Sequence, residues 1–245
     1  MDNKTLESIN NFIGKKTSSG IIKSIFNNGV NPLGLEFLGM GSTAIVFSKG
    51  KYAIKIYKRS NARMNYIEVN GESYCTCRWG KDISIEKEYK ILKELEGIEG
   101  IPKLHVNKGN YIVVDKVEGV TIEELAEKSY RAANDERIEL YMEYLDNFNL
   151  KNIYNQFKRL ALEIAFRGYL IKDAHIANIV IDKQGKVNII DVGGFKKEDN
   201  LRLNKLIEEN ENALIFGYLV REYLSDINSI KEEIIENLKE EKRVV

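Results

Sequence analysis

Apolar residues alternate with polar ones, or form short runs bounded by turn residues, in three parts of the chain. "LEFLGMGSTAIVFSKGKYAIKIY" (35–57) predicts a strand, a glycine turn, a strand, a tight turn and a third strand. "IPKLHVNKGNYIVVDKVEG" (101–119) predicts two strands around a Lys-Gly-Asn turn. Two more short strands are expected around 179–181 and 187–190, joined by Asp-Lys-Gln-Gly.

Other segments show the helical spacing of apolar residues. In "SIEKEYKILKELEG" (84–97) apolar residues recur every three or four positions, with Ser84 as the expected N-cap and Gly97 as the stop. Polar stretches interrupted by glycines at 14–31 and 59–83 predict loops. The remaining expected helices are 4–13, 121–149, 152–167 (ended by Gly168) and the charged tail 198–242.

Strands dominate the first half of these expectations and helices the second. The order therefore predicts an α+β fold with two lobes. We place an N-terminal helical extension at 1–33, a β-rich lobe at 34–117 and a helical lobe at 118–245.

Composition narrows the range of partners. Of 245 residues, 37 are Lys or Arg and 37 are Asp or Glu, so the net charge is zero and we expect neither nucleic acid nor membrane as a partner. The N-terminus has no signal-peptide core, so we expect a cytoplasmic protein, and secretion by a route without a cleavable signal is compatible with that. Cys75 and Cys77, with two histidines in the whole chain, do not suggest a four-ligand zinc site.

"LGMGSTAIVF" places Gly39 and Gly41 between two expected strands. Glycines let a backbone approach phosphate oxygens closely, although Gly-x-Gly in a hairpin is often only a turn. No Gly-Lys-Ser/Thr follows, which excludes a P-loop, and the next element is a strand rather than the helix of a dinucleotide fold. Lys55, at the centre of "YAIKIY", is either an outward edge residue or a cation for nucleotide phosphates held by a carboxylate.

Together these residues resemble protein kinases. Gly39, Gly41, Ala44 and Val46 are similar to the glycine-rich loop, and "AIK" ending at Lys55 is similar to the strand-three lysine. The resemblance implies ATP as a cofactor, bound by the loop with Ser42 and Thr43. It also implies Glu88 in "EYKIL" as the partner of Lys55, and a hinge in "VVDKVEG", with Val114 as gatekeeper and Asp115 to Val117 facing adenine.

"IKDAHIAN" resembles the kinase catalytic loop, because Asp173 and Asn178 are five positions apart. Asp191 in "DVG" follows Asn178 by thirteen residues, as in the family. The resemblance implies that Asn178 and Asp191 bind Mg²⁺ and that Asp173 accepts or orients the proton of the acceptor hydroxyl. Val46, Ala53 and Val180 match positions that sandwich adenine, and ordinary core packing would also explain all three residues.

Several positions depart from the kinase pattern. Ile171 and Lys172 replace the histidine and arginine before Asp173, and Val192 replaces phenylalanine. His175 gives the Asp-x-His-x-x-Asn pattern of aminoglycoside and choline phosphotransferases, and it either contacts the γ-phosphate or has a structural role.

The segment after Asp191 is short, and "NALIFGYLVREYL" (212–224) is similar to the F-helix with Asn212 at its usual aspartate. This plan resembles minimal bacterial effector kinases of the OspG and NleH type, and RIO-like kinases, with a reduced C-lobe. The insertion at about 59–83 is either a loop, which we favour, or a docking element for a partner protein.

Three functions follow from the resemblance. The first is a protein kinase that transfers phosphate to Ser or Thr of a protein substrate. The second is a small-molecule phosphotransferase, suggested by His175. The third is a pseudokinase that binds nucleotide, and the competent residues at the catalytic positions argue against it.

Overall fold

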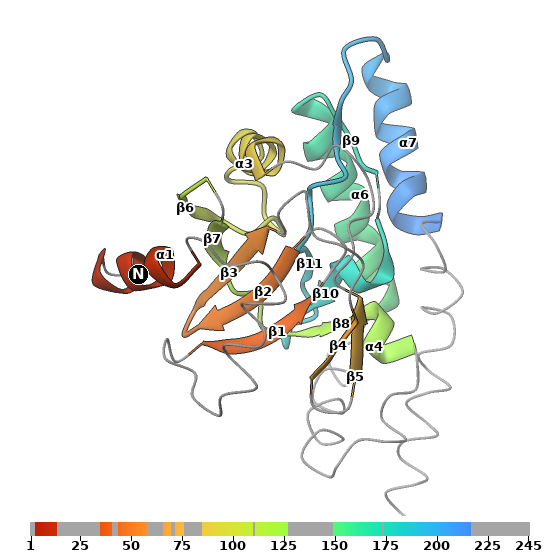
Figure 1. The fold of residues 1–245 in the computed structure, drawn as a ribbon. Coiled ribbons are helices and arrows are strands. Elements are labelled where there is room, and N and C mark those ends of the chain that lie inside the picture. Colours follow the sequence, from red (N-terminus) through yellow and green to blue (C-terminus); the bar gives the residue numbers. More distant parts are fainter. Residues whose placement is uncertain are drawn as a thin grey trace, which may run out of the picture. The chain divides into compact units, whose positions relative to one another are not determined.

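The computed structural model describes residues 3–13, 35–40, 44–57, 66–69, 72–75, 85–109, 111–126, 149–172 and 174–216. The chain divides into a first unit (Met1–Lys93 with Lys103–Lys116) and a second unit (Glu94–Pro102 with Val117–Val245). Strands dominate the described part of the first unit and helices that of the second (Figure 1). The predicted α+β fold, with a β-rich part followed by a helical part, is therefore confirmed.

The elements predicted for the first unit are present in their predicted order. The last residue of its second described helix, Glu94, belongs to the second unit. The elements are α1 (Asn3–Ile13), β1 (Glu36–Met40), β2 (Ala44–Lys49), β3 (Tyr52–Tyr57), β4 (Tyr66–Val69), β5 (Glu72–Cys75), α3 (Ile85–Glu94), β6 (Leu104–Asn107) and β7 (Tyr111–Asp115).

The second unit contains the predicted helix and hairpin, together with short strands that the sequence did not indicate. Its described elements are β8 (Val120–Thr121), α4 (Ile122–Ala126), α6 (Leu150–Phe166), β9 (Tyr169–Leu170), the 3₁₀ helix η2 (Ile176–Asn178), β10 (Ile179–Ile181), β11 (Val187–Ile189), β12 (Lys196–Lys197) and α7 (Leu203–Phe216). The predicted loop 14–31 and most of the predicted helices 121–149 and 198–242 lie outside the described residues.

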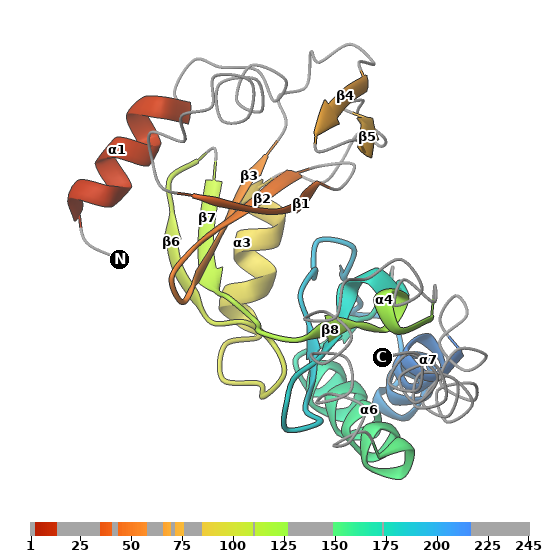
Figure 2. The same ribbon diagram turned by 90° about the horizontal axis from the view of Figure 1, so that it is seen from below.

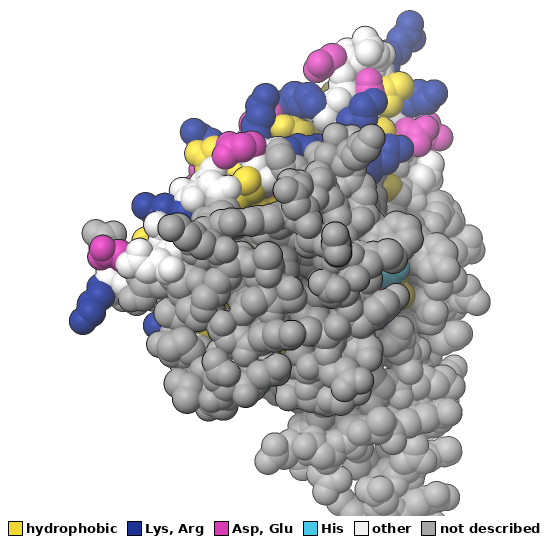
Figure 3. Space-filling model, viewed as in Figure 1, with side chains coloured by type: hydrophobic (Ala, Val, Ile, Leu, Met, Phe, Trp, Pro, Cys, Tyr) yellow, Lys and Arg dark blue, Asp and Glu magenta, His cyan; other side chains and the backbone are white. Residues whose placement is uncertain are grey.

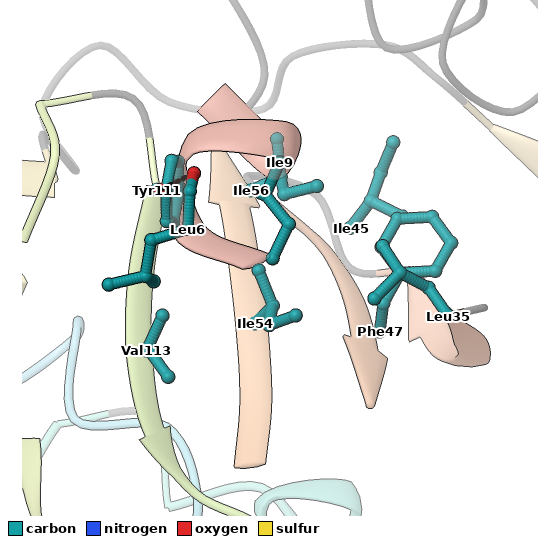
Figure 4. Packing of buried hydrophobic residues seen from close by; sticks show 9 residues of the cluster. All are labelled: Leu6, Ile9, Leu35, Ile45, Phe47, Ile54, Ile56, Tyr111 and Val113. Atoms are coloured by element: carbon teal, nitrogen blue, oxygen red, sulfur yellow. Dashed lines mark hydrogen bonds between the residues drawn. The ribbon is translucent and has the colours of Figure 1, made fainter. Parts of the chain in front are cut away.

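Five strands of the described residues form one sheet in the first unit, in the order β1-β2-β3-β7-β6, and all neighbours are antiparallel. Successive side chains of a strand point to opposite faces, so Ile54 and Ile56 of β3 lie on one face and Lys55 on the other. α1 covers the first face, where Leu6 and Ile9 pack among buried strand residues (Figure 4).

Tyr111 of β7 joins α1 to the sheet. Its ring is fully buried, and its hydroxyl donates a hydrogen bond of 3.1 Å to the carbonyl oxygen of Leu6. Burial raises the pKa of this hydroxyl. Full burial of one large apolar side chain stabilises a fold by about 1.5–3 kcal/mol, so α1 contributes to the core of the first unit.

The insertion between β3 and α3 contains a hairpin, because β4 and β5 pair antiparallel from Tyr66↔Cys75 to Val69↔Glu72. The predicted irregular loop is therefore wrong over these residues. Asn70-Gly71 stands between two short runs with strand-forming residues, which is a strong hairpin signal in the sequence. The other residues of 59–83 lie outside the described part of the chain.

In the second unit α6 and α7 lie side by side (Figure 1). Asn149 caps α6 by accepting a bond of 3.0 Å from the backbone N–H of Asn152. α6 ends at Phe166, within one residue of the prediction, and Gly168, whose φ of +73° suits glycine, turns the chain into β9. The turn packs Ala165, Leu170 and Leu206 together, with Leu201 and Ile207 beside them.

A small antiparallel sheet, β11-β10-β8, completes the described core of the second unit. Gln156 of α6 attaches the β10–β11 hairpin to the helix. Its Nε2 donates a hydrogen bond of 2.8 Å to the carbonyl oxygen of Gly185, and its Oε1 accepts one of 2.9 Å from the N–H of Val187. One amide side chain therefore fixes the turn of the hairpin against α6.

Charged side chains of both signs are interspersed on the described surface of the face in Figure 3. Where this face is described, the two signs of charge are therefore mixed rather than separated into two patches. Among the described residues, no helix combines the length and the apolar character needed to cross a membrane.

We predict that Gly119→Ala strongly destabilises the protein. A Cβ at this position would lie 2.4 Å from the carbonyl oxygen of Ile181 and 2.5 Å from Cγ1 of Val180. Relief requires movement of the β10 backbone, which costs on the order of 1–3 kcal/mol or more. The measurement is urea unfolding of the purified chain.

Gly39→Ala is the matched control, because a Cβ there would meet no atom within 4 Å. We expect it to change stability by less than about 0.5 kcal/mol. Equal destabilisation by both substitutions would contradict the close approach of Gly119 to β10.

Candidate functional site

Lys55 lies at the centre of the sheet of the first unit, on β3 between β2 and β7. The residue is 8% exposed, which excludes the edge or outward position considered from the sequence. Its Nζ forms an ion pair of 2.7 Å with Oε1 of Glu88, which is itself 2% exposed. The structure therefore brings together the lysine and the glutamate that the sequence paired.

The Glu88 carboxylate has a second partner that the sequence analysis missed. The hydroxyl of Tyr57 donates a hydrogen bond to Oε2 of Glu88. Tyr57 is two residues after Lys55 on β3, so the period of the strand places both on the face that meets α3. Each carboxylate oxygen of Glu88 is thus bonded, as a buried charge requires.

The sheet register places the predicted nucleotide contacts on the same face as Lys55. Val46 pairs directly with Lys55. In the next row, Ser48 pairs with Ala53, and Ala53 pairs with Val114. Side chains directly opposite each other on paired strands share a face, so Val46, Ala53 and Val114 surround Lys55 with small or apolar groups. Figure 2 shows this sheet with α1 and α3 in view.

Gly39 lies in β1 opposite Val46, after a register shift that includes Leu38. Nothing in the packing requires a glycine here, since a Cβ would meet no atom within 4 Å. Leu38 is a large apolar side chain that is 42% exposed beside this glycine, and the sequence analysis did not single it out. Gly41, Ser42 and Thr43, the rest of the predicted phosphate loop, lie outside the described residues.

The predicted hinge begins at the end of β7. The N–H of Asp115 donates a hydrogen bond of 2.9 Å to the carbonyl oxygen of Lys103. The N–H of Lys116 donates another, also of 2.9 Å, to the carbonyl oxygen of Lys51. These two donors are engaged within the protein, so a base at this segment would have to use other backbone groups. The Asp115 side chain lies 2.6 Å from Nε2 of His105, and Val117 is half-buried in the second unit.

In the second unit, the β10–β11 hairpin brings Asn178 and Asp191 to neighbouring positions. Ile190, the residue before Asp191, donates its N–H to the carbonyl of Asn178 at 2.9 Å, which continues the ladder one step past Ile179↔Ile189. Oδ1 of the Asp191 carboxylate accepts a hydrogen bond of 2.8 Å from the N–H of Gly193. Both side chains therefore leave the backbone at the open end of one hairpin.

The donor set of Asn178 and Asp191 suits Mg²⁺. Amide and carboxylate oxygens are hard ligands, and Mg²⁺ is usually bound by one or two carboxylates together with substrate phosphates. Within the described residues, no three His, Cys, Asp or Glu side chains gather in a position to bind a metal. A site completed by phosphate oxygens does not need three such side chains.

His175 begins η2. Its Nδ1 accepts a hydrogen bond of 3.2 Å from the N–H of Ala177, which assigns a capping role to this nitrogen. The same nitrogen lies 3.9 Å from Oε1 of Glu123, a pair that becomes ionic only when the imidazole is protonated. Asp173, the predicted catalytic base, lies outside the described residues.

Val180, the predicted adenine contact of the second unit, is the middle residue of β10. It is 5% exposed and pairs with Asn188 on one side and with Thr121 on the other. The close approach of Gly119 to its side chain adds to this packing. The core-packing explanation therefore holds for Val180, and a contact with a base remains compatible with it.

A buried asparagine of α7 fixes the chain before Asp173. Oδ1 of Asn210 accepts a hydrogen bond of 2.7 Å from the N–H of Ile171. Its Nδ2 donates hydrogen bonds to the carbonyl oxygens of Tyr169 (2.9 Å) and Ala161 (3.4 Å). Asn210 is fully buried, whereas Asn212 is exposed. α7 begins at Leu203, inside the helix predicted over 198–242, and it is Asn210 rather than Asn212 that makes these backbone bonds.

No protein-family model and no curated protein matches the chain. Among solved structures, the crystal structure of WbdD matches with 12% identity and a TM-score of 0.42, over 82% of this chain and 46% of that one. The chain thus spans less than half the length of WbdD. A likeness at this level leaves function to be argued from the residues of the site.

We predict that Lys55→Met destabilises the protein by about 3–5 kcal/mol, because it leaves the Glu88 carboxylate buried without its cation. The double variant Lys55→Met/Glu88→Gln is the control. It keeps an acceptor for the Tyr57 hydroxyl and removes the charge, so it should recover much of the loss. A single variant as stable as the unchanged chain in urea unfolding would contradict a buried ion pair.

We also predict that Asn210→Asp lowers stability by roughly 2 kcal/mol or more, because a carboxylate cannot donate to the two carbonyls that Nδ2 meets. Asn212→Asp is the matched control on the same helix, and its exposure predicts a change within about 0.5 kcal/mol. Chemical unfolding of both variants distinguishes the two asparagines. A larger effect at Asn212 would restore the sequence-based assignment.

Proposed function

We propose that this chain is an ATP- and Mg²⁺-dependent phosphotransferase of the protein-kinase type that phosphorylates Ser or Thr of a protein substrate. The observation that carries the proposal is the buried Lys55–Glu88 ion pair at the centre of the sheet. A lysine is expensive to bury, and a buried carboxylate partner keeps its ammonium group charged and oriented. Such a cation suits nucleotide phosphates.

The surroundings of Lys55 support a nucleotide as its ligand. Val46, Ala53 and Val114 share its face and offer apolar contact to a base, and Val180 is proposed as a further contact from the second unit. Gly39 provides a backbone without a side chain beside this face. Gly41, Ser42 and Thr43 remain proposed phosphate contacts.

Phosphoryl transfer needs alignment and charge neutralisation more than covalent chemistry from the protein. We assign Asn178 and Asp191 as the residues that would hold Mg²⁺, which supplies positive charge to the phosphate oxygens. Asp173 would accept or orient the proton of the acceptor hydroxyl. His175 shapes the loop through its bond to Ala177, and a contact of its other nitrogen with phosphate stays part of the proposal.

A small-molecule phosphotransferase is the second candidate. One observation favours it, since the Glu123 carboxylate lies 3.9 Å from His175. An acidic group beside the loop that carries Asp173 would suit an acceptor with amino groups, such as an aminoglycoside or choline. A partner protein docked on the β4–β5 hairpin remains a proposal for either function.

The test is incubation with γ-labelled ATP and Mg²⁺, with generic protein acceptors in one arm and aminoglycosides or choline in another. We expect label on protein, and Asp191→Asn or Asp173→Ala should lower its rate by at least about 100-fold, the usual cost of removing charge stabilisation in a transition state. Asp199→Asn, an exposed aspartate of the same unit, is the control and should keep full activity.

Label on a small molecule instead of protein would support the second candidate. ATP binding without any transfer would overturn both enzyme proposals and leave a nucleotide-binding pseudokinase. Retention of activity in Asp191→Asn would contradict the assignment of this residue to Mg²⁺.

A further inference from the structure

A group of charged and aromatic side chains lies outside the proposed site, where the end of α3 meets β9 and β12. Its four members are Glu94, Arg167, Tyr169 and Lys197, and we call them the Lys197 cluster. All four belong to the second unit. The proposed mechanism uses none of them directly.

Lys197 is the centre of this cluster. Its Nζ donates a hydrogen bond of 2.9 Å to Oε2 of Glu94 and another of 2.7 Å to the carbonyl oxygen of Arg167. The same ammonium group lies 4.5 Å from the centre of the Tyr169 ring, within the range of a cation–π interaction. Two hydrogen bonds and a ring contact hold one lysine side chain in one place.

The end of α3 is fastened by the other members. The Arg167 guanidinium donates to the backbone carbonyls of Glu94 and Glu96, which places a cation at the C-terminus of the helix. Tyr169 is 3% exposed, and its burial, together with a hydrogen bond to Glu94, raises the pKa of its hydroxyl.

Lys197 is also connected to Asp191 through a short, bonded stretch of chain. β12 pairs with β9, and the N–H of Glu198 donates 2.9 Å to the carbonyl of Gly168. Before β12, Phe195 donates its N–H to the carbonyl of Val192 at 3.0 Å, and both side chains are buried. The turn they form carries Gly193, whose N–H binds the Asp191 carboxylate.

We infer that Lys197 is a positioning residue for Asp191. By binding Glu94 it holds the segment 192–198 against the end of α3, and so fixes the turn that orients the Asp191 carboxylate. The inference rests on the proposed function, in which Asp191 ligates Mg²⁺.

Lys196 provides a matched control. It is the neighbouring lysine of the same strand, its side chain is 65% exposed, and it pairs with Glu198 at 3.1 Å. Lys196→Met and Lys197→Met remove the same group one position apart. Lys197→Arg tests rescue, since a guanidinium can still bind Glu94 and cover the Tyr169 ring.

The first measurement is hydrogen exchange of the full chain, which does not depend on catalysis. We expect Lys197→Met to speed exchange of the amides of 193, 195 and 198 by roughly three- to tenfold, the range set by a partly exposed ion pair with a ring contact. Lys196→Met should leave these amides unchanged, and Lys197→Arg should restore their protection. Equal exchange in the two Met variants would overturn the inference.

The second measurement is the Mg²⁺ concentration that gives half-maximal phosphoryl transfer. We expect Lys197→Met to raise it several-fold while the KM for ATP at saturating Mg²⁺ changes little, which loss of overall stability alone would not produce. Faster exchange with an unchanged Mg²⁺ requirement would overturn the link to Asp191. A chain without any transfer activity would refute the proposed function, and hydrogen exchange would still decide whether Lys197 holds the segment.

Discussion

The described part of the first unit is organised around the buried charge of Lys55, which needs a partner of opposite charge. Lys55 is buried at the centre of the sheet, so α3 has to present Glu88 to it, and Tyr57 has to satisfy the second carboxylate oxygen. This demand fixes which face of the sheet meets α3 and which face remains for α1. An ion pair of this kind adds little net stability compared with an apolar core, whereas loss of one partner would leave a buried charge without compensation.

In the second unit, side chains of α6 and α7 hold short strands and turns in place. Asn210 binds the backbone on both sides of Leu170, and Gln156 binds the turn of the β10–β11 hairpin. In both cases an amide side chain is used, because it can donate and accept at once and carries no charge that would need a partner. The backbone at 169–171 is thus fixed from α7, and the β10–β11 turn is fixed from α6.

The sequence predicted those features that depend on periodicity or on fixed spacing. The strands of 35–57 and the helix that ends before Gly168 fall in this class, whereas the pairing of Lys55 with Glu88 was implied by the resemblance to protein kinases. Asn210 escaped prediction because nothing in the local pattern distinguishes it from Asn212, and only the register of α7 decides which one is buried. Two-residue strands such as β9 and β12 are too short for a period and exist only through their partner strand. The β4–β5 hairpin was predictable from Asn70-Gly71, whereas the bond from Tyr57 to Glu88 required knowledge of where α3 lies.

The packing of α1 has a consequence for how the protein can be handled in the laboratory. Leu6 and Ile9 cover Ile54, Ile56 and the ring of Tyr111, which would otherwise form an apolar surface on the sheet. A shortened chain that starts at Leu35 would expose this surface to water and to other copies of itself, and such patches promote aggregation. Any shortened version of this chain should therefore retain the first helix, even though it is far in sequence from the residues proposed to bind Mg²⁺ and the acceptor.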